Sequence, residues 1–301
     1  MRRLGFWVII GCFLIGQGLK VDAGSHKLKV FVSILPQAYF VERIGGEAVD
    51  VEVLVGPGQS PATYEPTPKQ MARLGRARVY FRVGTPFEKG FIRKVKAAFK
   101  NLEIVDTRKG VPLRYFSTSR GDGTEVPDPH IWLDPKRVRI QAATICDTLC
   151  RLLPERAETF RRNLQNFLED LERLDRRIAD ILGPLKGGTF FVFHPAFGYF
   201  GDSYGLKQEA VEIAGKQPGP RQLAELIERA RRKHVRVIFV QPQFARNLAE
   251  KVARAIGGAV VPIDPLPRDY LKGLERMAEA LRKGLLTQRD EGGLSEAGRK
   301  Q

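Results

Sequence analysis

Short apolar runs alternate along the chain with stretches whose apolar residues recur at steps of three and four. The first pattern is typical of buried strands and the second of amphipathic helices. Strands that alternate with helices form mostly parallel sheets, so the pattern predicts an α/β protein made of two α/β halves. The predicted strands cover residues 28–35, 51–55, 79–83, 102–105, 189–193, 208–213, 235–240 and 259–263.

The longest helical pattern lies between the two halves. Its apolar residues form one stripe from Ala157 to Leu182, after Pro154 and before Gly183. About 28 residues at roughly 1.5 Å each give a rod on the order of 40 Å, which is long enough to join two lobes. A coiled-coil dimer is the alternative use of such a stripe. The predicted organisation is a signal peptide at 1–23, an N-terminal α/β lobe at 24–153, a connecting long helix at 154–184, a C-terminal α/β lobe at 185–287 and a disordered tail at 288–301.

The N-terminus has the pattern of an export signal. Two arginines precede an apolar run over residues 4–16, and the small residues at 21–23 suit a cleavage site, which predicts a mature chain from Gly24. Residues 9–12 resemble a lipoprotein cleavage box, so lipidation at Cys12 is the second interpretation. The sequence therefore predicts a protein of the periplasm or the extracytoplasmic face.

The chain is strongly basic, with a net charge of +16. Its positive clusters, such as Arg161-Arg162 and residues 231–233, fall on predicted helices without interleaved aromatic residues. This pattern, in an exported protein, does not predict nucleic-acid binding. Attraction to anionic membrane headgroups or to an acidic partner is the favoured interpretation, and a generally basic proteome is the alternative.

Two cysteines, Cys146 and Cys150, remain after the predicted signal peptide. They are four residues apart in a helical pattern and therefore share a face, where small buried apolar residues are the usual use. A strained local disulfide is the alternative. Neither a second cysteine pair nor an adjacent histidine is present to complete a metal site with them.

One histidine lies in a segment with an unusual concentration of rigid residues, Asp128-Pro129-His130-Ile131-Trp132-Leu133-Asp134-Pro135. The two prolines disfavour helix at the residues before them, so His130 is predicted in a short rigid turn with carboxylates nearby. A rigid histidine beside carboxylates suits a metal site. A hydrogen-bonded loop histidine is the alternative.

The remaining histidines are separated by where they lie relative to the predicted strands. His194 follows the strand 189–193 and Asp264 follows the strand 259–263, so both are predicted at the carboxyl edge of the second sheet, where ligands bind. His26 and His234 precede their strands and are predicted to be surface residues.

His130, His194 and Asp264 form the candidate metal site. Two imidazole nitrogens and one carboxylate oxygen suit zinc, and also manganese or iron. Taken singly, Asp264 is also explained as a turn-forming Asp-Pro and His194 as a satisfied loop histidine.

The order of the motifs resembles a known family. Segments 56–68, 128–135, 194–200 and 264–266, with the long helix between the second and third, are similar to the zinc/manganese solute-binding proteins of bacterial ABC importers, the cluster A-I periplasmic metal-binding proteins. The resemblance implies two Rossmann-like lobes with mostly parallel sheets, joined by one long connecting α-helix. It also implies metal held in the cleft by His130, His194 and Asp264, and delivery to a membrane permease.

One position departs from the family pattern. A histidine usually follows the proline of the first loop, and this chain has Ala62 there, without a donor atom. The family's His-rich loop is also missing, because residues 107–126 contain no histidine and are predicted to be an irregular surface excursion. Candidate fourth ligands are Glu65, Gln59 and Gln241.

The predicted function is therefore capture of a divalent metal, zinc first and manganese or iron as alternatives, by a monomer that delivers it to an ABC permease. An open zinc position also suits a hydrolase, which is the rival hypothesis. The sequence has no His-Glu-x-x-His, Gly-x-Ser-x-Gly or phosphate-loop motif, so an enzyme is not predicted. A metal-free module that binds envelope polyanions is a second rival.

Overall fold

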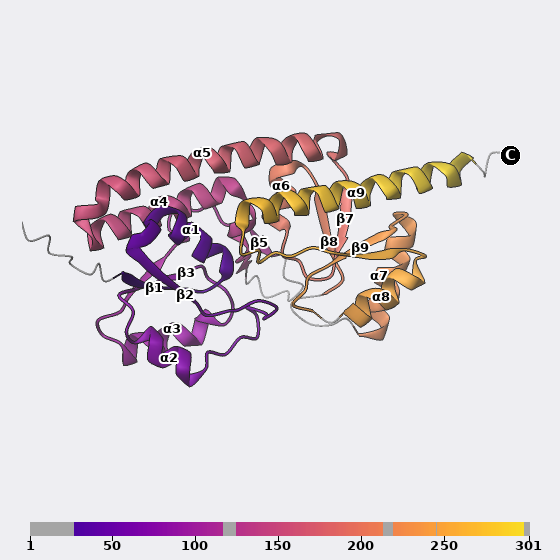
Figure 1. Cartoon of the computed structure of the whole chain (residues 1–301). Helices are drawn as coiled ribbons and strands as arrows, with labels where there is room; N and C mark the ends of the chain where they lie inside the picture. Colours follow the sequence, from indigo (N-terminus) through magenta and orange to yellow (C-terminus); the bar gives the residue numbers. More distant parts are fainter. Residues whose placement is uncertain (1–26, 117–124, 213–218, 245, 298–301) are drawn as a thin grey trace, which may run out of the picture.

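The computed structural model describes residues 27–116, 125–212, 219–244 and 246–297. The predicted signal peptide, Cys12 and His26 lie outside these residues. The N-terminal lobe contains β1 (Leu28–Val32), α1 (Leu35–Gly45), β2 (Val49–Val53), α2 (Pro68–Leu74), β3 (Val79–Arg82), α3 (Glu88–Ala98) and β4 (Glu103–Asp106). Figure 1 shows this lobe in indigo and purple.

The sheet of the N-terminal lobe is parallel, in the order β2-β1-β3-β4. Successive residues of a strand point to opposite faces. Val30 and Val32 pack in the core shared with α1, whereas Phe31 packs with Leu74 and Phe91 in a core under α2 and α3. Both faces are therefore buried, as the continuous apolar runs of the sequence predicted.

The C-terminal lobe repeats this design. It contains β7 (Thr189–Val192), α6 (Gly198–Tyr204), β8 (Lys207–Ala210), α7 (Pro220–Arg232), β9 (Val237–Val240), α8 (Arg246–Ala255) and β10 (Ala259–Pro262). Its strands are parallel in the order β10-β9-β7-β8. The fold class predicted from the sequence, two α/β lobes with mostly parallel sheets, is confirmed.

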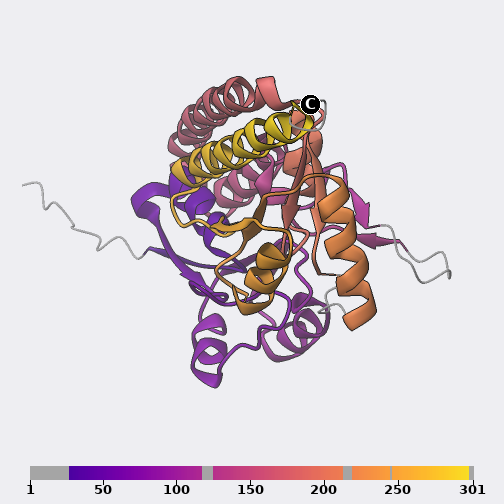
Figure 2. The same cartoon turned by 90° about the vertical axis from the view of Figure 1, so that its right-hand side faces the viewer.

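Three long helices form a layer on one side of the sheets. They are α4 (Pro135–Leu152), which packs on the N-terminal lobe, α5 (Ala157–Leu182), which extends from one lobe to the other, and α9 (Tyr270–Ala297), which runs beside α5 over the C-terminal lobe (Figures 1 and 2). The predicted connecting helix is present as α5. Its apolar stripe, including Phe160, Phe167 and Ile178, is buried against α1, α4 and α9 of the same chain. The stripe is thus used within one chain, which is not what a coiled-coil dimer requires.

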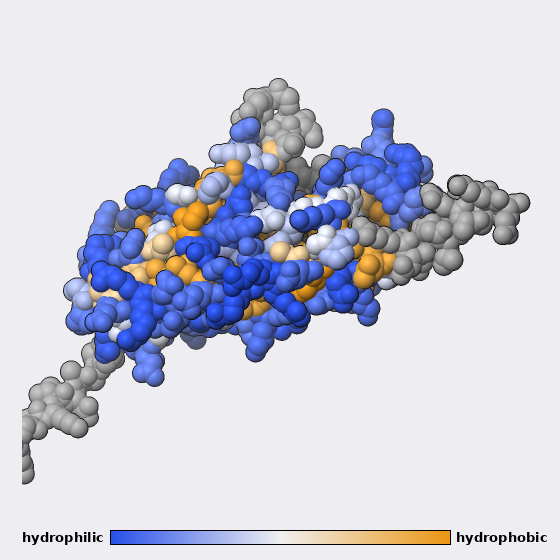
Figure 3. All heavy atoms as spheres, turned by 90° about the horizontal axis from the view of Figure 1, so that it is seen from above, coloured by the Kyte–Doolittle hydropathy of each residue, from blue (hydrophilic) through white to orange (hydrophobic). Residues whose placement is uncertain are grey.

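The outer face of this helical layer is polar. Figure 3 shows it mostly hydrophilic, with narrow hydrophobic stretches between the helices. Among the described residues, no helix is both long and apolar enough to cross a membrane.

Two segments differ from the sequence-based expectation. Within residues 107–126, predicted to be irregular, β5 (Tyr115–Phe116) pairs antiparallel with β6 (Val126–Pro127). Two-residue strands are too short to show an alternating pattern, so periodicity does not detect them. The helix α9 continues to Ala297 and therefore includes most of the segment 288–301 that the sequence placed in a disordered tail.

The two cysteines are free thiols on one face of α4. Their sulfur atoms are 3.8 Å apart, Cys146 is buried and Cys150 is half-buried. Burial raises the pKa of the Cys146 thiol to about 12, so this group remains protonated at neutral pH. This agrees with the interpretation as small buried residues rather than a disulfide.

Candidate metal centre

His130 occupies a turn that fixes its ring. It precedes a single 3₁₀ turn, Ile131–Leu133, and its backbone N–H donates to Asp128 Oδ1 at 3.0 Å. The ring nitrogen Nδ1 lies 2.6 Å from the same oxygen, and Asp128 is fully buried. A carboxylate only accepts, so Nδ1 carries the ring proton and Nε2 keeps its lone pair free.

His194 is held in the same way by a different set of elements. It lies just after β7, and its Nδ1 is 2.5 Å from Glu212 Oε2. Its backbone is pinned by Gln241, whose Oε1 accepts from the His194 N–H at 3.1 Å and whose Nε2 donates to the His194 carbonyl at 2.8 Å. The ring therefore also presents Nε2 as a free donor atom.

Burial affects the protonation of His194. Desolvation lowers its pKa below the ordinary value, and the hydrogen bond to Glu212 opposes this only in part. The neutral ring is the form that binds a metal, so the site keeps a competent ligand over a wider range of pH.

The two free nitrogens face each other from opposite lobes. His130 Nε2 and His194 Nε2 are 3.4 Å apart. Two nitrogens bound to one tetrahedral zinc at about 2.0–2.1 Å are separated by about 3.3–3.4 Å. The pair therefore has the spacing of two ligands on a single zinc ion.

Aromatic rings surround the imidazole pair. Phe244 stacks on the His194 ring with centroids 4.9 Å apart and an angle of 24°. Trp132 and Phe116 contact the His130 ring at centroid distances of 5.2 and 6.5 Å. These rings exclude water from the sides of the imidazoles and limit their rotation.

Asp264 does not join the pair in this structure. It is exposed after β10, and its Oδ1 accepts from Gln243 Nε2 at 3.0 Å and from the Leu266 N–H at 2.9 Å. Within the described ranges, no group of three or more His, Cys, Asp and Glu side chains is arranged to hold one metal ion. The structure thus brings His130 and His194 together and leaves Asp264 as a turn residue beside them.

The candidate fourth ligands are placed as follows. Gln59 Oε1 accepts from the Gly56 N–H at 2.8 Å, so its oxygen is used within its own loop. Both amide atoms of Gln241 bind the His194 backbone. Glu65 and Ala62 are exposed in the first loop. Of the three candidates, Glu65 is therefore the one whose side-chain oxygens are most available to bind a metal.

Two hydrogen-bond connections join the lobes beside the site. Trp132 Nε1 donates to the Pro265 carbonyl at 2.7 Å. The Tyr199 hydroxyl donates to the Asp128 carbonyl at 2.9 Å and accepts from the Arg114 N–H at 2.8 Å. The turns that carry His130 and Asp264 are therefore each fixed to the opposite lobe.

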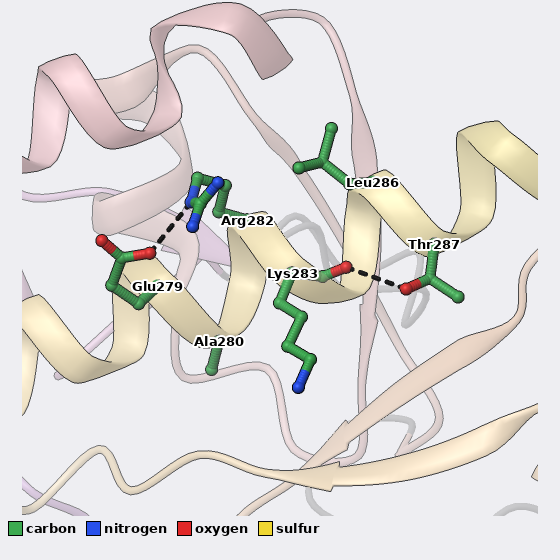
Figure 4. Close-up of a pocket in the computed structure, with 6 residues that line it drawn as sticks. All are labelled: Glu279, Ala280, Arg282, Lys283, Leu286 and Thr287. Atoms are coloured by element: carbon green, nitrogen blue, oxygen red, sulfur yellow. Dashed lines mark hydrogen bonds and ion pairs between the residues drawn. The ribbon is translucent and has the colours of Figure 1, made fainter.

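A hollow elsewhere in the molecule is unrelated to this centre. Figure 4 shows it along α9, where its lining residues all belong to one helix. Glu279 and Arg282 in it pair with each other at 2.9 Å. It is lined by Glu279, Ala280, Arg282, Lys283, Leu286 and Thr287, none of which lies at a strand end.

The fold and the site together define a class of protein. Two parallel α/β lobes joined by a long helix, with one imidazole from each lobe facing the other, are the architecture of a two-lobed binding protein. The family model for the zinc-uptake complex component A, periplasmic, matches residues 30–284, so the chain belongs to this family.

Individual relatives agree. The zinc-binding lipoprotein AdcA of Streptococcus pneumoniae serotype 4 is 26% identical over 95% of this chain, which spans 60% of that relative. The manganese ABC transporter substrate-binding lipoprotein PsaA of Streptococcus anginosus is 28% identical over 80% of this chain and 82% of its own. A crystal structure of a zinc-bound ZnuA deletion mutant has a TM-score of 0.81 at 37% identity, covering 86% of this chain and 98% of that one. The resemblance noted from the motifs is confirmed.

Sequence reasoning missed two residues of the site. Glu212 fell inside the predicted strand 208–213, whereas β8 ends at Ala210 and releases Glu212 at the carboxyl edge. Phe244 follows β9 in the same way. The strand-end rule, applied to aromatic as well as polar residues, could have found Phe244. It could not have found Glu212, because the predicted strand continued past it to residue 213.

Proposed function

We propose that this chain captures a divalent metal, zinc in the first place, between its lobes and delivers it to an ABC permease. His130 and His194 bind the ion through Nε2. The observation that carries the proposal is the facing pair of nitrogens 3.4 Å apart, with each ring held by a buried carboxylate. The family membership supports the transport role.

The donor set favours zinc over manganese. Imidazole nitrogens suit zinc, while manganese prefers carboxylate and water oxygens. Asp128 and Glu212 do not touch the metal in this arrangement, but each increases the basicity of the ring that it binds. The two nearby carboxylates also offset the charge of a dication.

We infer that Asp264 supplies a third ligand from the turn beside the pair. Its neighbour Pro265 is bound to Trp132, which itself contacts His130, so the turn lies against the site. Rotation of the carboxylate away from Gln243 and the Leu266 N–H frees an oxygen for the ion. Water or Glu65 takes the position that Ala62 leaves open.

The lobes move little on binding in this proposal. The cross-lobe hydrogen bonds of Trp132 and Tyr199, together with the continuous core under α5 and α9, oppose a wide hinge. The chain works as an exported monomer at the outer face of the membrane, where the permease lies.

Calorimetric titration with zinc and manganese, combined with elemental analysis, tests the proposal. The wild type is compared with His194→Ala, Asp264→Ala and Ala62→His. We expect one equivalent of zinc, a large loss in the histidine variant, a smaller loss in the aspartate variant, and a gain of at least tenfold in Ala62→His because a ligand is added. Zinc affinity that is the same in wild type and His194→Ala would contradict the proposal.

A further inference from the structure

One segment of the N-terminal lobe exposes charges of a single sign. Between residues 68 and 101 the one acidic residue is Glu88. It is fully buried and binds Arg82 at 3.0 Å, so it contributes nothing to the surface. The exposed cations of this segment, called here the α2–α3 face, are Lys69, Arg73, Arg76, Arg78, Lys89, Arg93, Lys94, Lys96 and Lys100.

The fold directs these cations to one side of the molecule. The apolar sides of α2 and α3 pack on the sheet through Leu74, Phe91, Ile92 and Val95. Both helices therefore turn their charged sides outward, and they cover the sheet on the side away from α5 (Figure 1). The α2–α3 face is thus the outer surface of the lobe opposite the connecting helix.

The other basic helices are different because acidic residues are interleaved with their cations. On α7, Arg221 pairs with Glu225 and Arg232 pairs with Glu228, and α5 has the pair Arg173–Asp170. On α3, within the described part of the chain, the exposed cations form no ion pair. On α2, Arg73 pairs with Glu52 of the neighbouring strand β2 at 2.6 Å. The positive charge is therefore least compensated on the α3 part of the α2–α3 face.

We propose that the α2–α3 face binds the anionic headgroup layer of a membrane. Lipid phosphates are accessible to an exported protein, and lysine and arginine both bind phosphate. The segment exposes no aromatic side chain for stacking on bases, and the exposed large apolar residues of the described chain, Tyr115 and Val126, lie outside it. Binding is therefore electrostatic, reversible and weakened by salt.

The consequence is a defined orientation at the membrane. The face belongs to the N-terminal lobe alone, and neither His130 nor His194 is part of it. The metal centre therefore stays free while the lobe rests on lipid, and membrane binding does not depend on bound zinc.

The test is sedimentation with vesicles of equal phosphatidylglycerol and phosphatidylcholine, and with phosphatidylcholine alone, in low and high salt. The chain starts at Gly24, which keeps every described residue and removes the apolar leader. The test variant is Arg93→Gln, Lys94→Gln, Lys96→Gln on α3. The matched control removes the same charge from exposed positions of the other lobe, Arg229→Gln, Lys251→Gln, Arg254→Gln. Glutamine is a good helix former, so both variants should fold, which thermal unfolding and zinc titration check.

We expect binding to the anionic vesicles alone, lost at high salt. A basic residue at an anionic surface contributes roughly a fivefold gain in partition, so the α3 variant should bind at least tenfold more weakly and the control nearly as well as wild type. Equal weakening in both variants would show that net charge alone is responsible, which overturns the proposal. Absence of binding to the anionic vesicles, or binding to an acidic polysaccharide such as heparin instead, overturns it as well.

Discussion

The two halves of the candidate metal centre use the same chemistry but are built differently. In the N-terminal half, Asp128 lies two residues before His130 and binds both its ring and its backbone. In the C-terminal half, His194 depends on Glu212 and Gln241, which follow two other strands. One half is therefore fixed by a local turn and the other by the register of the sheet.

The halves also differ in how firmly they are held. Asp128 is fully buried, and its backbone carbonyl accepts the Tyr199 hydroxyl. The side chain of His194 is 18% exposed, compared with 11% for His130. The N-terminal half is therefore the rigid half and the C-terminal half is the less buried one. Removal of matched groups from the two halves should change zinc affinity and stability by different amounts.

Removal of the rings themselves should have the largest effect. Either His130→Ala or His194→Ala deletes one of the two proposed nitrogen ligands, so zinc affinity should fall by more than the roughly 10–100-fold lost with an outer partner. Calorimetry with zinc measures both. His234→Ala is the control, because that histidine is exposed. If one of the two ring variants bound zinc like wild type, the facing pair would not be the site.

The two carboxylates come next. Loss of Glu212 in Glu212→Ala frees the His194 ring to rotate and should reduce zinc affinity on the order of 10–100-fold. Glu212→Gln keeps an acceptor for Nδ1–H and should recover part of this loss. Rescue by glutamine separates positioning of the ring from a general loss of packing.

Asp128→Ala should reduce affinity to a similar extent but also destabilise the fold. Asp128 accepts from the His130 N–H and from the ring, and a buried donor left unpaired costs about 1–3 kcal/mol. Thermal unfolding of the metal-free variants measures the difference. Equal destabilisation by Asp128→Ala and Glu212→Ala would remove the distinction between a rigid half and a less buried half.

The two halves of the site also differ in how much of each could be predicted from the sequence. His130 could be selected as a candidate because Asp-Pro breaks are local signals that act through backbone sterics, and His194 because strand ends can be read from apolar runs. Asp128, the hydrogen-bond partner of His130, belongs to the same sequence motif. The parallel sheets followed from the alternation of strands and helices, which periodicity reports directly.

The rest of the site depends on how the strands pair in the folded protein. Glu212 reaches His194 because β8 pairs beside β7 and ends at Ala210, which the sequence pattern does not specify to the residue. Gln241 was predicted as a candidate ligand, but its amide is used by the His194 backbone. Asp264 was predicted from the strand-end rule and remains a proposal, since its side chain is bound within its own turn.

The hydrogen bond from Trp132 to Pro265 offers a test of the connection between the halves. Trp132→Phe keeps a ring beside His130 but removes the Nε1 donor, so a buried carbonyl loses its partner and stability should fall by about 1–3 kcal/mol. Zinc should also dissociate faster, because the turn carrying Asp264 is released.

Tyr199→Phe is the matched comparison, since it removes a hydroxyl that joins the lobes on the Asp128 side. Urea unfolding and stopped-flow zinc release measure both variants. Faster zinc release in Trp132→Phe alone would place the third ligand in the Asp264 turn. Equal release rates would indicate that the cross-lobe bonds hold the fold and not the ligand.

The pH dependence of stability should give the smallest effect, and it concerns the less buried half. The pKa of His194 is lowered in the folded protein, mainly by burial. Above the ordinary pKa of about 6.5 the ring is neutral in both the folded and the unfolded protein, so the stability contributed by the buried neutral ring is fully present. As pH falls below that value the unfolded chain takes up the proton first, and stability is lost until the folded pKa is reached, by at most about 1.4 kcal/mol per pH unit.

The difference in unfolding free energy between metal-free wild type and His194→Gln, measured from pH 7.5 to 5, isolates the contribution of the His194 ring. A difference that did not change over that range would mean that burial does not disfavour the charged ring.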